Sequence, residues 1–194
     1  MILENLRGKE IILASQSPRR QELLKGLGVD FKVFVKDGID EDFDLEMPFN
    51  EVATFLAQKK ANAYSDQILE NVIVITADTI VCTDSQILNK PSDRSDSIRM
   101  LNELSGKQHK VITGVCIKSF HKEICFSSET VVNFKDLEQE EVEYYVDNFK
   151  PYDKAGAYGI QEWIGFIGIT GIEGSYFNVM GFPIQKVYTE LKKF

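Results

Sequence analysis

The chain has 194 residues, of which 43% are hydrophobic and 27% charged, and its formal net charge is −8 at pH 7. This size and composition are typical of a globular protein with one substantial core. The acidic balance argues against a nucleic-acid-binding protein, because such proteins concentrate positive charge. No stretch reaches the ~18 uninterrupted apolar residues of a membrane span, and the N-terminus lacks a signal-peptide pattern.

The three cysteines, Cys82, Cys116 and Cys125, lie in apolar, strand-like stretches without CxxC spacing. This pattern favours buried free thiols over a framework of disulfides. The two histidines, His109 and His121, also lack the spacing of metal ligands, so a zinc site is not expected. We expect a protein of the reducing cytoplasm that binds neither membrane nor nucleic acid.

The first elements predicted along the chain are a strand over residues 10–15 and a helix over residues 17–27. The helix begins with the run Ser17-Pro18-Arg19-Arg20, in which serine suits the N-cap and proline the first helical position. Acidic residues would be favoured in this first turn, because the helix dipole is positive there. The two arginines and the free N–H groups therefore predict a phosphate-binding site. A pair of ordinary surface arginines is the alternative.

Hydrophobic periodicity predicts the later elements. They are strands at 31–35, 72–75, 108–119 and 124–134, a hairpin around 84–85, and helices near 50–65, 93–104, 137–148 and 183–193. Strands and helices alternate at first, and the two long β-rich stretches then suggest antiparallel pairing. The order predicts one compact α/β domain over residues 1–194, with a mixed sheet and flanking helices.

Asp78 lies just after the apolar run 72–75, where we expect a buried strand to end. A carboxylate there is costly unless a metal, a cation or a reacting proton is nearby, and ligands of open α/β sheets bind at this edge. The acidic loop 37–42 offers Asp40 or Glu41 as a second carboxylate for a divalent cation. A turn-capping aspartate and a solvated loop are the alternatives.

Two lysines and one glycine-rich run could complete a site for a charged ligand. Lys60 lies in a predicted helix and Lys90 in an extended segment before Pro91. Either could neutralise phosphate, although most lysines are simply solvated. In the run from Asp153 to Gln161 the glycines permit close approach of a ligand, and the glutamine amide can read a base edge. Ordinary turns are the alternative.

Six motifs, spread in order over nearly the whole chain, carry a family resemblance. They are Ser15-x-Ser17-Pro18-Arg19-Arg20-x-Glu22-Leu23-Leu24, Ala77-Asp78-Thr79, Lys90-Pro91, Leu104-Ser105-Gly106 with Thr113-Gly114, Asp153-Lys154-Ala155-Gly156-Ala157-Tyr158-Gly159-Ile160-Gln161, and Gly181-Phe182-Pro183. Together they resemble the Maf family of nucleoside triphosphate pyrophosphatases. The resemblance implies an elongated, two-lobed α/β fold similar to that of inosine triphosphate pyrophosphatases, with a central cleft.

The resemblance also implies a chemistry and a set of site residues. A divalent cation (Mg²⁺, Mn²⁺ or Co²⁺) would assist hydrolysis between the α- and β-phosphates, which releases monophosphate and pyrophosphate. The motif around Asp78 and the glycine-rich run are similar to those of the subfamily that prefers dTTP and UTP to 7-methyl-GTP. The implied residues are Asp78 as general base or metal ligand, Glu41 as metal ligand, Ser15, Arg19, Arg20, Lys60 and Lys90 for the triphosphate, and Arg19, Thr79 and Gln161 for base specificity.

Two functions follow from these expectations. The first is a house-cleaning enzyme that removes dTTP, UTP and modified pyrimidine nucleotides. The alternative is a nucleotide-sensing or partner-binding protein, linked to septum formation, that binds nucleotide without turnover. The costly carboxylate at Asp78 and the four cations favour the enzyme. A homodimer is plausible.

Overall fold

The computed structural model describes residues 3–194. They form two compact units, the first made of residues 3–78, 113–128 and 181–194 and the second of residues 79–112 and 129–180. The strands belong to one seven-stranded sheet with the order β2-β1-β3-β5-β6-β7, and β4 pairs with β3. Parallel pairing of β1 with β2 and β3, and antiparallel pairing of β4 and β7 with their neighbours, make the sheet mixed, as predicted.

Three long strands contribute residues to both units. They are β3 (Val72–Cys82), β5 (Gln108–Ser119) and β6 (Glu123–Phe134). The other elements of the first unit are η1 (Glu4–Leu6), β1 (Glu10–Leu13), α1 (Pro18–Gly26), β2 (Lys32–Val33), α2 (Phe49–Asn62), η2 (Ser65–Gln67) and α7 (Ile184–Leu191). Those of the second unit are β4 (Ile87–Leu88), α3 (Arg94–Leu104), α4 (Gln139–Phe149), η3 (Ala155–Ala157), α5 (Trp163–Gly168), β7 (Ile169–Glu173) and α6 (Tyr176–Val179).

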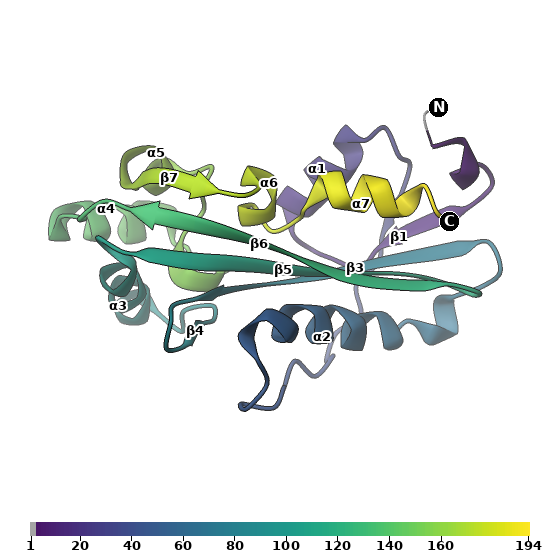
Figure 1. The fold of residues 1–194 in the computed structure, drawn as a ribbon, viewed down its shortest axis with the longest axis horizontal. Coiled ribbons are helices and arrows are strands. Elements are labelled where there is room, and N and C mark those ends of the chain that lie inside the picture. The colour runs from purple at the N-terminus through teal and green to yellow at the C-terminus, as the bar shows by residue number, and fades with distance from the viewer. Residues whose placement is uncertain (1–2) are drawn as a thin grey trace. The chain divides into compact units, whose positions relative to one another are not determined.

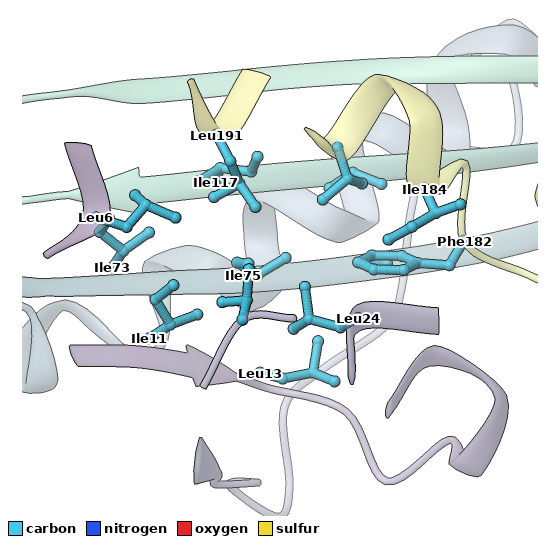
Figure 2. Packing of buried hydrophobic residues seen from close by; sticks show 14 of the residues in the cluster. Leu6, Ile11, Leu13, Leu24, Ile73, Ile75, Ile117, Phe182, Ile184 and Leu191 are labelled. Atoms are coloured by element: carbon cyan, nitrogen blue, oxygen red, sulfur yellow. The ribbon is translucent and has the colours of Figure 1, made fainter. Parts of the chain in front are cut away.

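The core of the first unit follows from the alternation of side chains along its strands. Alternate residues of β1, β3 and β5 form one apolar face, which α1 and α7 cover (Figure 2). This face includes Leu13, Ile75 and Ile117, and each is essentially fully buried. The opposite face packs against α2, where Ala57 and Ala61 lie over β5. In this unit α2 therefore lies on one side of the strands, and α1 and α7 lie on the other (Figure 1).

Two predicted strand boundaries are wrong. The strand predicted at 72–75 continues to Cys82, because the β-branched and apolar residues after it extend the pattern and its last residues pair with β4. The strand predicted at 31–35 covers only Lys32–Val33. The segment after Gln161, for which no element was predicted before residue 183, contains α5, β7 and α6.

The start of α1 also differs in detail from the prediction. Ser17 occupies the N-cap position and Pro18 begins the helix, but the Ser17 side chain makes no capping hydrogen bond. Instead, the Ser17 N–H donates to the hydroxyl oxygen of Ser15 at 3.3 Å. The hydroxyl of Ser15 thereby holds the backbone just before the helix, and the side-chain cap that was predicted does not form.

The second unit has its own core, in which one histidine is buried. The side chains of α3 and α4 pack there against residues of β5, β6 and the 157–164 segment. His109 is 2% exposed, and its Nε2 lies 2.7 Å from the hydroxyl of Tyr158. Burial lowers the pKa of His109 to about 4. The imidazole is therefore neutral at physiological pH.

Within the part of the chain that the structure describes, no helix has the length and apolar character needed to cross a bilayer.

Gly114 lets α2 approach β5 closely, and this contact can be tested by substitution. A Cβ atom at this position would lie 2.2 Å from the backbone of Ala53. We expect Gly114→Ala to lower the free energy of unfolding by roughly 3 kcal/mol, because backbone must move to admit the methyl group. Gly26→Ala, where a Cβ has no neighbour within 4 Å, should be neutral or stabilising by about 0.5–1 kcal/mol. Equal urea midpoints for both variants would contradict this packing.

The buried histidine predicts a specific dependence of stability on pH. The folded-state pKa of His109 is about 4, below the ~6.5 of an unfolded chain. Between these values the unfolded state binds more protons, so stability falls as pH drops through this window. From pH 7 to 4.5 the wild type should lose about 2–3 kcal/mol more than His109→Gln. Exposed His121 supplies the control. If His121→Gln reduced the pH dependence of the unfolding free energy as much as His109→Gln, the assignment of that dependence to His109 would be refuted.

Candidate active site

Asp78 lies in the middle of β3 and faces α2. Side chains on a strand alternate between the two faces of the sheet, so Asp78 shares a face with Thr76. The Thr76 hydroxyl donates to the carbonyl of Ala57 in α2 at 2.6 Å, which fixes that face as the one covered by α2. The expectation that Asp78 ends a strand was wrong, and its carboxylate instead interrupts the buried strand beneath a helix.

Lys60 brings two carboxylates together. It follows Ala57 by one helical turn in α2, so its ammonium reaches the same face of β3. Its Nζ forms ion pairs with Asp78 Oδ1 and, at 2.9 Å, with Glu41 Oε1. The Lys60 and Asp78 side chains are only 17% and 14% exposed, whereas Glu41 is 54% exposed. Lys60 and Asp78 therefore form a partly buried ion pair, and Glu41 adds a second, more exposed carboxylate.

The neighbouring lysine has different partners. Lys59 Nζ contacts Asp40 Oδ2 at 2.6 Å and the carbonyl of Asp42 at 2.9 Å. Its hydrogen bond lowers the pKa of Asp40. Of the two acidic residues that the sequence left open, Glu41 is the one placed with Asp78. Lys59 and Asp40 form a second, exposed pair that ties the acidic loop to α2.

Arg20 is fixed beside Asp78 by oxygen atoms of three segments. Its Nε donates to the carbonyl of Gly181 and its Nη1 to that of Ala77, both at 2.8 Å, and Nη1 also lies 3.4 Å from Ser15 Oγ. Burial lowers the pKa of Arg20, and the charge of Asp78 acts in the opposite direction. Arginine stays protonated under either influence. The site therefore contains a fixed guanidinium.

Arg19 adds a second positive charge next to Arg20, and this charge also lowers the pKa of Arg20. Both arginines are half-buried. The structure thus brings Ser15, Arg20, Lys60, Glu41 and Asp78 together within the first unit, with Arg19 adjacent.

The carboxylates of Asp78 and Glu41 fit a divalent metal. Their oxygens already converge on one cation, the ammonium of Lys60. Hard carboxylate oxygens are the ligands that Mg²⁺ and Mn²⁺ prefer, and Co²⁺ also accepts them. Asp78 and Glu41 would therefore be the residues that hold such an ion.

Thr79, Lys90 and Gln161 belong to the second unit. Thr79 follows Asp78 in β3 and is half-buried, while Lys90 is exposed in front of buried Pro91. The side-chain oxygen of Gln161 is buried, and it has no hydrogen-bond partner among the residues described. A buried amide oxygen without a partner is costly, so this one is suited to a donor from outside the protein.

Sequence reasoning missed the network that holds the segment around Gln161. Lys154, only 8% exposed, forms an ion pair with Glu162 at 3.1 Å. The Tyr145 hydroxyl donates to Glu162 and accepts from the N–H of Gly159 at 3.1 Å. Lys154 was visible as part of the glycine-rich run, but no periodicity relates that run to Tyr145 in α4.

Comparisons with known proteins show which family the chain belongs to. A family model described as Maf-like protein matches residues 10–194. A dTTP/UTP pyrophosphatase of Phocaeicola vulgatus is 51% identical over 192 residues, which cover 99% of this chain and 100% of that protein. A second dTTP/UTP pyrophosphatase, of Parabacteroides distasonis, is 50% identical over 193 residues, which cover 100% of this chain and 100% of that protein.

Among solved structures, a HAM1 protein from Coxiella burnetii has a TM-score of 0.49 and 14% identity, covering 96% of this chain and 100% of that one. The family model and the two relatives match this chain over nearly its entire length. The chain belongs to the Maf-like family.

Proposed function

We propose that this chain is a nucleoside triphosphate pyrophosphatase that hydrolyses dTTP and UTP to the monophosphate and pyrophosphate. The observation that carries the proposal is the convergence of Asp78 and Glu41 on Lys60 beside the fixed Arg20 guanidinium. Relatives about 50% identical over the full chain are named for this activity. A house-cleaning role in the cytoplasm, where free thiols such as its three cysteines persist, is part of the same proposal.

The cations of the first unit suit a polyphosphate. The chain carries a net charge of −8, so it can hold a triphosphate only where positive charge is concentrated. Arg20 donates hydrogen bonds to two backbone carbonyls, so the fold fixes the position of its positive charge. Lys60 is a flexible point charge that can transfer its hydrogen bonds from carboxylates to phosphate oxygens. These residues would neutralise the charge of bound triphosphate and of departing pyrophosphate.

Asp78 is the proposed catalytic carboxylate. The water oxygen forms a bond to the α-phosphorus while the bond to the β-phosphate's bridging oxygen breaks, and pyrophosphate leaves. Asp78 would accept the proton of that water, acting as general base. A divalent cation, when held by Asp78 and Glu41, would supply further neutralisation of phosphate charge. Asp78 thus has two proposed roles, as base and as metal ligand.

Other proposed roles rest on the family resemblance. Ser15, Arg19 and Lys90 would contact the triphosphate. Arg19, Thr79 and Gln161 would determine base specificity. The buried, unpartnered oxygen of Gln161 supports this role, because the N3–H of thymine or uracil is a donor that such an oxygen could accept.

A sensing protein without turnover is not favoured. Binding of a polyphosphate is weakened by any carboxylate beside it, because like charges repel. Two carboxylates, Asp78 and Glu41, nevertheless converge within this site. Hydrolysis explains their presence, because it needs a proton acceptor such as Asp78 as well as a metal ligand.

A pyrophosphate-release assay with Mg²⁺, Mn²⁺ or Co²⁺ tests the proposal. The wild type should release pyrophosphate from dTTP and UTP, and chelation of the metal should stop the reaction. Asp78→Asn keeps the shape but removes the proton acceptor, so kcat should fall by roughly 10²–10⁴-fold. Asp40→Asn makes the same change at a carboxylate paired with Lys59, and its rate should stay within about twofold of wild type.

Three outcomes would contradict the proposal. Nucleotide binding without any release would favour the sensing protein. An equal loss of kcat in Asp78→Asn and Asp40→Asn would show that Asp78 has no special role. A preference for 7-methyl-GTP would refute the roles given to Thr79 and Gln161.

A further inference from the structure

A second group of possible metal ligands lies in the hairpin formed by β5 and β6. Cys116 comes from β5, and Glu123 and Cys125 come from β6. Their two sulfur atoms and one carboxylate oxygen all lie within 4.8 Å of one another. Among the residues that the structure describes, this is the one group of three such side chains with ligand atoms so close.

The hairpin turn explains why the two cysteines meet. The N–H of Ser119 donates to the carbonyl of Lys122 at 2.7 Å, and Lys118 pairs with Glu123 at 2.6 Å across the strands. Continuing this register by two residues sets Cys116 opposite Cys125. Side chains at directly opposed positions point to the same face of the sheet, and the two sulfur atoms accordingly lie close together.

We propose that Cys116, Cys125 and Glu123 bind one thiophilic divalent ion of the Zn²⁺ class. Two thiolates and one carboxylate are ligands that tetrahedral Zn²⁺ accepts, with metal–ligand distances of roughly 2.0–2.3 Å. Sulfur and oxygen atoms that already lie within 4.8 Å of one another can move into that shell through side-chain rotation. Cys125 and Glu123 reach the surface, so water can fill the fourth position.

The surroundings of the cluster balance the charge of such a site. Two thiolates, one carboxylate and a divalent ion together carry a single negative charge. The ammonium of Lys118 lies 2.6 Å from Glu123 Oε2 and would offset it. The Gln58 amide donates to the other oxygen, Oε1, at 2.6 Å. Hydrogen bonds to a ligating carboxylate orient it for the metal.

The ion would also connect the hairpin to α2. Cys116 packs against Ala57 and Ala61 of that helix, and Gln58 extends from the same helix to Glu123. An ion held by β5 and β6 would therefore stabilise the surface on which α2 rests. This site is independent of the proposed pyrophosphatase chemistry, because it shares no ligand with Asp78 and Glu41.

Titration of the reduced protein with Cd²⁺, without nucleotide, tests the proposal. We expect one thiolate-to-cadmium charge-transfer band whose intensity saturates at one equivalent of Cd²⁺. The band should disappear when Zn²⁺ displaces the Cd²⁺. At saturating Cd²⁺ the Tm should rise by roughly 5–10 °C. Cys125→Ser should abolish the band, and Glu123→Gln should weaken Cd²⁺ binding by about 10–100-fold. Cys82→Ser is the matched control and should keep the band, since Cys82 lies in the second unit and contacts the Lys110 carbonyl.

The controls separate this proposal from the previous one and from misfolding. Asp78→Asn should leave the cadmium band unchanged even where it abolishes pyrophosphate release. Half-buried Cys125 is a safer substitution than fully buried Cys116, and a wild-type circular dichroism spectrum would verify its fold. Absence of a band in the reduced wild type would overturn the proposal. So would a band that survives Cys125→Ser, or a mass showing that the two thiols form a disulfide and cannot be reduced.

Discussion

The ion pair between Lys60 and Asp78 is the constraint on which the candidate site depends. A carboxylate in the middle of a buried strand costs several kcal/mol unless a cation compensates it. Here the cation comes from α2, and the same ammonium also binds Glu41 from the acidic loop. The pair therefore determines which face of β3 carries the candidate site, which loop contacts it, and where Arg20 meets an opposite charge.

The close packing of α2 on the sheet makes this pair possible. Gly114 removes a side chain where β5 meets Ala53, and Thr76 hydrogen-bonds to the Ala57 carbonyl. Small residues on one face of α2 bring the helix near the strands, and Lys60 then extends from the same helix to Asp78. The fold of the first unit and its candidate site consequently depend on one contact between helix and sheet.

Much of the fold and part of the candidate site could be predicted where the determining pattern lies in neighbouring residues of the sequence. Apolar alternation gave the strands and helices, and the cost of a buried carboxylate identified Asp78. Prediction failed where a feature depends on contacts between segments that are distant in the sequence. The continuation of β3 depends on pairing with β4, the choice between Asp40 and Glu41 depends on how a loop lies on α2, and the Cys116–Cys125 contact depends on hairpin register.

A double-mutant cycle on Lys60→Met and Asp78→Asn tests the central claim most directly, with the free energy of unfolding as the readout. Each single change removes the Lys60–Asp78 ion pair and leaves the remaining, partly buried charge with weaker compensation, so each should destabilise by about 2 kcal/mol or more. The double variant should cost less than their sum by more than about 1 kcal/mol. The exposed pair Lys59→Met and Asp40→Asn should show coupling below about 0.5 kcal/mol. Additive effects at Lys60 and Asp78 would contradict the account.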